Sequence, residues 1–246
     1  FHRTRGGETP EMLLAAAKTL APLDAALSRE TYLQALEASF HAGRFGDGRG
    51  LLKAAEAARD APPPPTPPRP VDLLLDGLVT RFTEGYEASV PSLQRALLSL
   101  RADDAGTDDD NGRWLWLACH VGAMLWDDES IYVLADRAVR LAREAGALTT
   151  LPAALNALAL ILVLTGDLAH ASELFAEEDA ITRATGAPPL PNSRLSLAAW
   201  RGRQDGTSEL FSTTIAEATA RGEGLTVSST EAAIAYLHNG LGTYDI

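Results

Sequence analysis

The chain has 246 residues, of which 46% are hydrophobic and 6% aromatic, and its formal net charge is −12 at pH 7. Alanine and leucine, both good helix formers, supply most of the apolar residues, and strand-like alternation of Val, Ile and Thr is nearly absent. The composition therefore predicts an all-α protein. A surface with this excess of acidic groups repels phosphate, so we expect no direct binding of nucleic acid or of an anionic membrane.

Cysteine usage and the longest apolar run indicate the compartment. Cys119 is the single cysteine, so no intramolecular disulfide can form, which suits a reducing cytoplasm. The longest apolar run, residues 151–165, is shorter than a membrane span and contains Pro152 and Asn156. The start has no signal-peptide pattern, and the ends "FHRTRGG" and "GLGTYDI" resemble internal cuts. We expect a cytoplasmic fragment of a longer protein.

Glycines that follow one apolar run and precede the next recur along the chain. One series is spaced by 42, 81, 36 and 40 residues and consists of Gly43, Gly85, Gly166, Gly202 and Gly242. The midpoint of its long step falls at residues 126–130, a turn with capping acids but no glycine. A second series, spaced by 40 and 36, consists of Gly146, Gly186 and Gly222. Since a glycine commonly ends a helix, the two series predict two helices in each unit of about 40 residues.

Helical hairpins of this size cannot bury both faces alone, so they stack on their neighbours. We therefore predict a TPR-like α-solenoid with a period of about 40 residues, forming a single repeat domain over residues 1–246. The apolar residues from Ile131 to Ala145 have helical spacing, and Asp167 is placed to cap the helix that follows Gly166. An irregular helical bundle with chance glycines is the alternative.

A proline-rich tract, "DAPPPPTPPRP" at residues 60–70, interrupts the first repeat. It cannot be a helix or a central strand and favours an extended polyproline conformation. We interpret it as a loop inside an irregular first repeat, because the spacing of 42 between Gly43 and Gly85 carries across it. The alternatives are a domain linker and a ligand for a proline-recognising partner.

An acidic run, "RADDAGTDDDNGRW" at residues 101–114, is similar to a calcium loop in composition only. Placing Gly112 at the sixth position of an EF-hand loop puts Thr107 first and Ala118 twelfth, so two principal ligands are missing. We expect a solvated loop and no metal site. Weak cation binding by Asp108, Asp109 and Asp110 is the alternative.

The sequence contains no constellation that indicates catalysis. Cys119 and His120 are adjacent, and adjacent helix residues point about 100° apart, which does not suit a nucleophile and its base. H-E-x-x-H, G-x-S-x-G and C-x-x-C are absent, and the glycine-rich residues 43–53 lack the G-K-[ST] of a phosphate loop. We therefore expect this chain not to be an enzyme and to hold no cofactor.

Polar residues inside apolar first helices are the candidates for a ligand groove. Arg113, Trp116 and His120 fall on one stripe of a tryptophan-rich helix, and Asn156 and Arg194 interrupt later apolar helices. Solenoids present the first helix of each hairpin on their concave face, where ligands dock. The alternatives are that the tryptophans belong to the core and that Asn156 hydrogen-bonds a neighbouring backbone group.

Several phrases together resemble the helical-repeat region of large ATP-binding regulators of the LuxR family, the MalT-like signal-transduction ATPases of actinobacteria. They are "TYLQALEASFHAGR", "RWLWLACHVGAMLWDDES", "RLAREAGALTTLPAALNALALILVLTGDLAHASELFAEEDAITRATGAPP" and "LAAWRGR". The similarity runs from Glu11 to Tyr244 and is strongest from Arg113 to Arg203. The resemblance implies a TPR-like sensor array between an ATPase domain and a DNA-binding helix-turn-helix. ATP and DNA binding would then belong to those flanking domains.

Two functions follow as expectations. In the first, the chain is a sensor and scaffold domain of such a transcription regulator, and a small effector or partner protein binds in its concave groove. In the second, the chain is a purely structural module for self-association or for docking the flanking domains, without a ligand.

Overall fold

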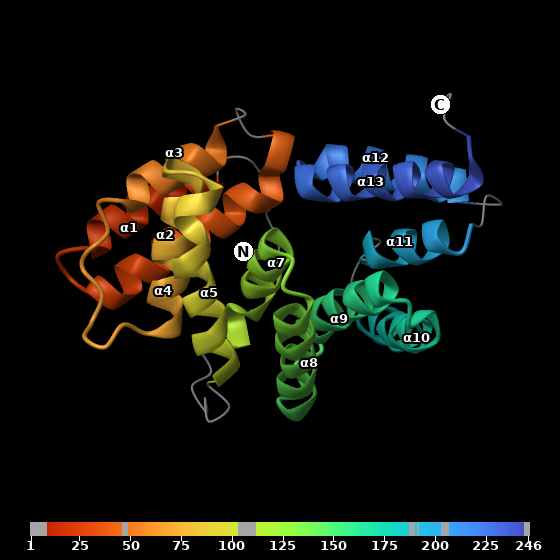
Figure 1. Cartoon of the computed structure of the whole chain (residues 1–246), viewed down its shortest axis with the longest axis horizontal. Coiled ribbons are helices and arrows are strands. Elements are labelled where there is room, and N and C mark those ends of the chain that lie inside the picture. Colours follow the sequence, from red (N-terminus) through yellow and green to blue (C-terminus); the bar gives the residue numbers. More distant parts are fainter. Residues whose placement is uncertain are drawn as a thin grey trace. The chain divides into compact units, whose positions relative to one another are not determined.

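A computed structural model describes residues 9–45, 49–102, 112–186, 190, 192–202 and 207–243. These residues form α-helices joined by short connections, with one 3₁₀ turn and no strand among them (Figure 1). The prediction of an all-α protein is confirmed. Within these ranges, no helix combines the length and the apolar character that crossing a membrane requires. The acidic residues 103–111 lie outside the described residues, as do the predicted alternative cation ligands Asp108, Asp109 and Asp110.

The chain divides into two compact units. Unit 1 comprises Phe1–Leu117 and Ala218–Leu225, and unit 2 comprises Ala118–Glu217 and Thr226–Ile246. The single repeat domain expected over residues 1–246 stays a prediction.

Unit 1 is built from helices that follow one another along the chain. They are α1 (Thr9–Leu20), α2 (Ala25–Ala42), α3 (Gly50–Ala58), α4 (Pro70–Thr83) and α5 (Tyr86–Ala102), with the 3₁₀ turn η1 (Gly43–Phe45) after α2. Each α-helix contacts the next one, α1 also contacts α3, and α2 also contacts α4. The proline-rich tract connects α3 to α4, so it is a loop inside unit 1 and not a linker between the units.

In unit 2, as in unit 1, complete helices that follow one another along the chain contact each other. Its complete helices are α8 (Asp128–Glu144), α9 (Leu151–Thr165), α10 (Leu168–Thr185) and α11 (Asn192–Trp200). Three further helices have residues in both units, namely α7 (Leu115–Leu125), α12 (Thr207–Arg221) and α13 (Gly224–Leu241). Within unit 2, α9 contacts α8, α10 and α11, and α10 also contacts α11.

Residues with positive φ follow the helices where the glycine spacing predicts them. Among the described residues, the glycines with positive φ are Gly43, Gly85, Gly146, Gly166, Gly186, Gly202, Gly222 and Gly242, the members of the two series. Gly166 ends α9 with φ 90°, a conformation that glycine adopts without strain because it has no Cβ. Asp167 then caps α10 by accepting a hydrogen bond from His170 N at 3.1 Å. Both the glycine series and the capping role of Asp167 are confirmed.

The turn at residues 126–130, which the first glycine series predicts but which has no glycine, also contains a residue with positive φ. Trp126 follows α7 with φ 56° and is the one non-glycine residue with positive φ in the described part of the chain. Asp127 then caps α8 and accepts hydrogen bonds from Ser130 N at 3.0 Å and from Ser130 Oγ at 2.6 Å. A tryptophan therefore occupies the place that glycine takes at the other turns of this series.

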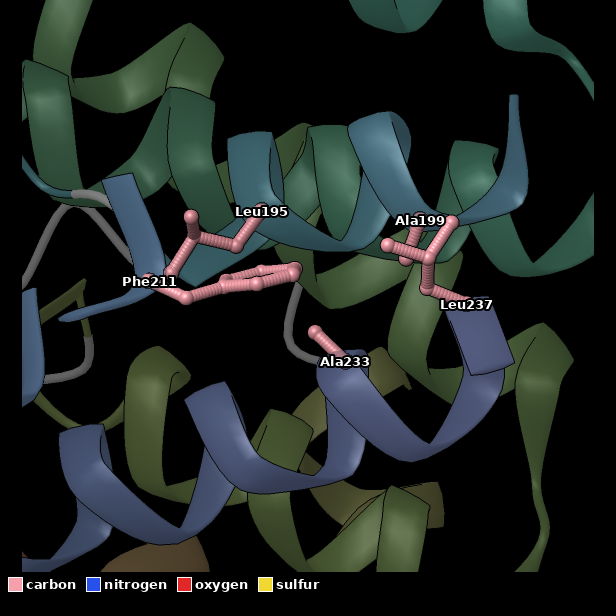
Figure 2. Packing of buried hydrophobic residues seen from close by; sticks show 5 residues of the cluster. All are labelled: Leu195, Ala199, Phe211, Ala233 and Leu237. Carbon is pink, nitrogen blue, oxygen red and sulfur yellow. The ribbon is translucent and has the colours of Figure 1, made fainter. Parts of the chain in front are cut away.

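After four of these turns, at Gly85, Trp126, Gly166 and Gly202, the next helix buries a small residue and, four positions later, a large apolar one. The pairs are Ser89 and Leu93, Ser130 and Leu134, Ala171 and Phe175, and Thr207 and Phe211, all at most 4% exposed. They recur at intervals of 41, 41 and 36 residues. Leu93 packs so closely on Gly77 of α4 that a Cβ there would lie 2.5 Å from Leu93 Cδ2. Phe211 packs with Leu195 of α11 and Leu237 of α13 (Figure 2).

Substitution of a left-handed glycine and substitution of the left-handed tryptophan should have opposite effects on stability. Replacing Gly166 by alanine forces a Cβ into the left-handed region and should lower the free energy of unfolding by about 1–2 kcal/mol. Trp126→Gly removes that strain, and it should leave the free energy of unfolding unchanged or raise it by up to about 1 kcal/mol. Urea denaturation of both variants measures the difference. A large loss of stability in Trp126→Gly would mean that the indole ring supports the fold.

Candidate functional site

Two of the predicted groove residues contact α2 within unit 1. The ring of Trp116, at the start of α7, stacks on His41 of α2 with centroids 4.3 Å apart and planes inclined by 15°. Arg113, just before α7, donates to the side-chain oxygen of Gln34, also on α2, in the amide orientation that satisfies both groups. Its guanidinium carbon also lies 5.0 Å from the centre of the ring of Trp114, which is buried. Trp116 therefore joins α7 to α2, and Arg113 joins the residues just before α7 to the same helix.

His120, the third residue of the predicted stripe, lies four positions after Trp116 in α7 and is half-buried. Its neighbour Cys119 is buried, and burial raises the pKa of the thiol to about 12. The thiol is therefore protonated at neutral pH and is not an activated nucleophile. Among the described residues, no group of three His, Cys, Asp or Glu side chains could hold a metal ion.

Asn156 on α9 is held by groups of its own chain. Its Nδ2 donates to the carbonyl oxygen of Leu190 at 3.0 Å and, more weakly, to Glu178 Oε2 at 3.4 Å. Its Oδ1 accepts a hydrogen bond from Ser193 Oγ at 2.8 Å. Of the two interpretations of Asn156, these contacts favour a structural role, because the amide is already engaged by a backbone carbonyl and two side chains.

Glu178 on α10 is the buried charge of this cluster, with an exposed fraction of 1%. Its Oε1 accepts a hydrogen bond from Leu190 N at 3.2 Å. Burial raises the pKa of the carboxyl above its ordinary value, while the hydrogen bonds from Leu190 and Asn156 and the charge of Arg194 oppose that rise. Glu178 lies seven residues after the buried Ala171 of the same helix. In α5, the residue seven positions after the buried Ser89 is Ala96, so Glu178 occupies a position that an apolar residue fills in that helix.

Arg194 on α11 completes the connection to α10. Its Nη1 lies 2.8 Å from Asp179 Oδ2, and its Nη2 donates to the carbonyl oxygen of Phe175 at 3.4 Å. The guanidinium carbon also lies 5.3 Å from the centre of the Phe175 ring. We call Asn156, Glu178, Ser193 and Arg194 the Asn156–Glu178 cluster, and it links α9, α10 and α11.

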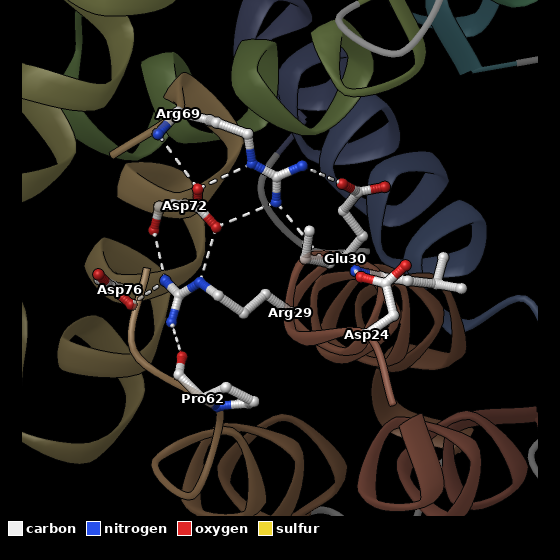
Figure 3. A network of polar contacts seen from close by, with 9 residues as sticks. Asp24, Arg29, Glu30, Pro62, Arg69, Asp72 and Asp76 are labelled. Carbon is white, nitrogen blue, oxygen red and sulfur yellow. Dashed lines mark hydrogen bonds and ion pairs between the residues drawn. The ribbon is translucent and has the colours of Figure 1, made fainter. Parts of the chain in front are cut away.

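A second polar network, which the sequence did not predict, joins α2, the proline-rich loop and α4 in unit 1 (Figure 3). Arg29 of α2 is almost fully buried, and its Nε lies 2.7 Å from Asp72 Oδ1. Its Nη1 donates to the carbonyl oxygen of Pro62 at 2.8 Å, which fixes the start of the loop. Its Nη2 lies 2.5 Å from Asp76 Oδ1.

Arg69 fixes the other end of the loop. Its Nε lies 2.9 Å from Asp72 Oδ2, and its Nη1 lies 2.5 Å from Glu30 Oε1 (Figure 3). Asp72 is fully buried, which by itself would raise the pKa of its carboxyl. The hydrogen bonds and charges of Arg69 and Arg29 outweigh burial and hold that pKa below its ordinary value. Asp72 therefore remains ionised between the two arginines and holds both ends of the loop to α4.

Asp72 gives a stability prediction with a matched control. Asp72→Asn leaves two guanidinium groups without their shared carboxylate, one of them buried, and should lower the free energy of unfolding by about 3–5 kcal/mol. Asp76→Asn removes a half-exposed carboxylate of the same network and should lower it by less than about 1 kcal/mol. Chemical denaturation at neutral pH compares the two. Equal, small losses would mean that the network does not hold the loop.

Glu178 gives a pH prediction. Because its folded-state pKa is raised, the folded protein binds this proton more readily than the unfolded chain does. The stability that protonation contributes is fully present below the ordinary pKa of 4.5 and is lost as the pH rises through the raised value. Glu178→Gln removes this titration, so wild type should gain stability relative to the variant as the pH falls from 7 to 4.5. A constant difference between the two denaturation curves over that range would contradict the assignment.

Comparison with protein families, with curated proteins and with solved structures found no match to this chain. Its function therefore has to be inferred from its own residues.

Proposed function

We propose that the chain is a TPR-like α-solenoid that serves as the sensor and scaffold domain of an ATP-dependent transcription regulator of the LuxR family. The observation that carries the proposal is the recurrence of one structural unit. A left-handed residue ends a helix, and the next helix buries a small and then a large side chain at intervals of 41, 41 and 36 residues. Such recurrence is typical of arrays in which each hairpin packs on its neighbours.

The contacts inside each unit support the same proposal. Within unit 1, α2 touches α3 and also α4, and within unit 2, α9 touches α10 and also α11. In a stacked array the first helix of one hairpin meets both its own partner and the first helix of the next hairpin. The resemblance to MalT-like regulators supplies the regulatory role, and it assigns ATP and DNA binding to domains outside this chain.

An effector could act on such an array by competing for the contacts that join its helices. The predicted groove residues Trp116 and Asn156 already have partners on other elements of their own unit. A ligand that replaced His41 beside Trp116, or Leu190 beside Asn156, would bind one arrangement of the helices better than another. Such differential binding is what a ligand needs to shift a conformational equilibrium.

The second candidate is a purely structural module for protein interaction or self-association, without a small ligand. The contacts of Arg113 with Gln34 and of Arg194 with Asp179 favour it, because both side chains are engaged by neighbouring helices. Under this proposal the groove residues stabilise the array and have no effector to bind.

A titration distinguishes the two candidates. Metabolites and purified partner fragments are added to the chain while tryptophan fluorescence and thermal stability are recorded. The sensor proposal expects a ligand that raises the melting temperature of wild type and acts more weakly on Trp116→Phe and Asn156→Ala. The structural proposal expects no such ligand and a sedimentation coefficient that increases with protein concentration. A chain that neither responds to ligands nor associates would contradict both.

The repeat itself predicts which deletions the chain tolerates. Removing residues 128–168 deletes α8, α9 and one full period, so that Ala171 replaces Ser130 three positions after the capping Asp127. Because a repeat array is stabilised by contacts between neighbours, this variant should stay helical and unfold cooperatively at a lower temperature. Circular dichroism during heating measures both properties.

The matched control deletes residues 128–147, which removes α8 alone and reverses the alternation of the two helix types. This shorter deletion should abolish cooperative unfolding. If the longer deletion abolished it as well, the chain would be an irregular bundle and not a repeat array.

A further inference from the structure

Trp126 combines two unfavourable features, a positive φ and an exposed indole ring. Its φ of 56° lies in the left-handed region, where a residue with a Cβ is strained by about 1–2 kcal/mol. Its side chain is 89% exposed, so burial of the indole ring does not offset that strain. Glycine stands at the corresponding position of the neighbouring turns, at Gly85 and Gly166, and would form this turn without strain.

Strained backbone conformations cluster at functional sites of proteins. Tryptophan is among the residues that most often anchor protein interfaces, because a large rigid ring contributes much contact area. An exposed tryptophan at the turn between α7 and α8 is therefore suited to contact a partner.

The residues after Trp126 are acidic and aromatic. On α8, Asp128, Glu129 and Asp136 are exposed, and the ring of Tyr132 between them is 46% exposed. Asp128, Tyr132 and Asp136 are four residues apart, so they lie on one side of the helix. No lysine or arginine occurs between Trp126 and Asp136 in the sequence. We call these five residues, Trp126, Asp128, Glu129, Tyr132 and Asp136, the acidic–aromatic surface.

The charge of this surface determines what it can bind. The carboxylates of Asp128 and Glu129 outweigh the partial positive charge of about half a unit at the start of α8, whereas the charge of Asp136 is partly offset by Arg143. Phosphate groups of nucleic acids or lipids would be repelled. A guanidinium group suits the surface, since it can lie flat on an indole or phenol ring and also donate two hydrogen bonds to a carboxylate.

We propose that the acidic–aromatic surface docks an arginine-bearing segment of a partner protein, with Trp126 as its aromatic anchor. The inference rests on the proposed function of the chain as an interaction module and names a surface and a partner class for it. It does not involve the predicted groove residues, so the site lies at the turn between α7 and α8 and not in the groove.

The test uses the whole chain and a synthetic peptide that carries four arginines separated by alanines, with binding measured by calorimetry. A second peptide has citrulline, the uncharged isostere, in place of each arginine. Trp126→Gly keeps the charge of the chain and should weaken binding of the arginine peptide by about two- to fivefold, the effect of one exposed cation–π contact. The double variant Asp128→Asn, Glu129→Gln should weaken it further and reduce its salt dependence. The citrulline peptide should bind the wild type more weakly than the arginine peptide does.

Trp200→Ala is the matched control, because it removes another exposed tryptophan of unit 2, 48% exposed, without changing the charge. It should leave the affinity for the arginine peptide unchanged. Equal affinities for wild type and Trp126→Gly, equal losses in the two tryptophan variants, or equal binding of the citrulline peptide would each overturn the proposal. A melting temperature of Trp126→Gly clearly below that of wild type would also overturn it, since the ring would then have a structural role. If the peptide experiment contradicts the docking proposal but the variant lacking residues 128–168 still folds, the docking proposal is wrong and the proposal of a repeat array remains.

Discussion

Most of the described helices are followed, within two residues, by a residue with positive φ, which changes the direction of the chain. Glycine adopts a positive φ without strain, and the eight glycines with positive φ stand at the ends of helices. After Gly85, Trp126, Gly166 and Gly202, the following helix buries a small residue and, four positions later, a large apolar one, as at Ser89 and Leu93. The start of each of these four helices depends on this local backbone constraint.

Polar side chains then connect helices that the turns have brought together. The Asn156–Glu178 cluster joins α9, α10 and α11, and the network of Arg29 and Asp72 fixes the proline-rich loop against α2 and α4. A buried ion pair is seldom worth more than an apolar replacement, but removing one partner is strongly destabilising. These groups therefore specify which helices meet, while the apolar pairs provide most of the stabilisation.

The sequence allowed the helical class, the glycine turns and the capping aspartates to be predicted, because each depends on residues within a few positions of one another. The network of Arg29 and Asp72 could not be predicted, since its members are 43 residues apart and no short motif marks them. Spacing alone placed Asn156 on a helix face but did not reveal that Leu190 and Ser193 would engage its amide. Trp126 was visible only as a missing glycine in a regular series, which predicts a turn and gives no sign of left-handed strain or exposure.

Native-state hydrogen exchange under increasing denaturant tests the central claim most directly, because it reports which segments open together. In an array of helical hairpins, neighbouring hairpins should open in separate steps, and α9 and α10 should lose protection together when Asn156 is replaced by alanine. A single global opening shared by all protected amides, unaffected by that replacement, would contradict an array of repeated hairpins joined by polar contacts.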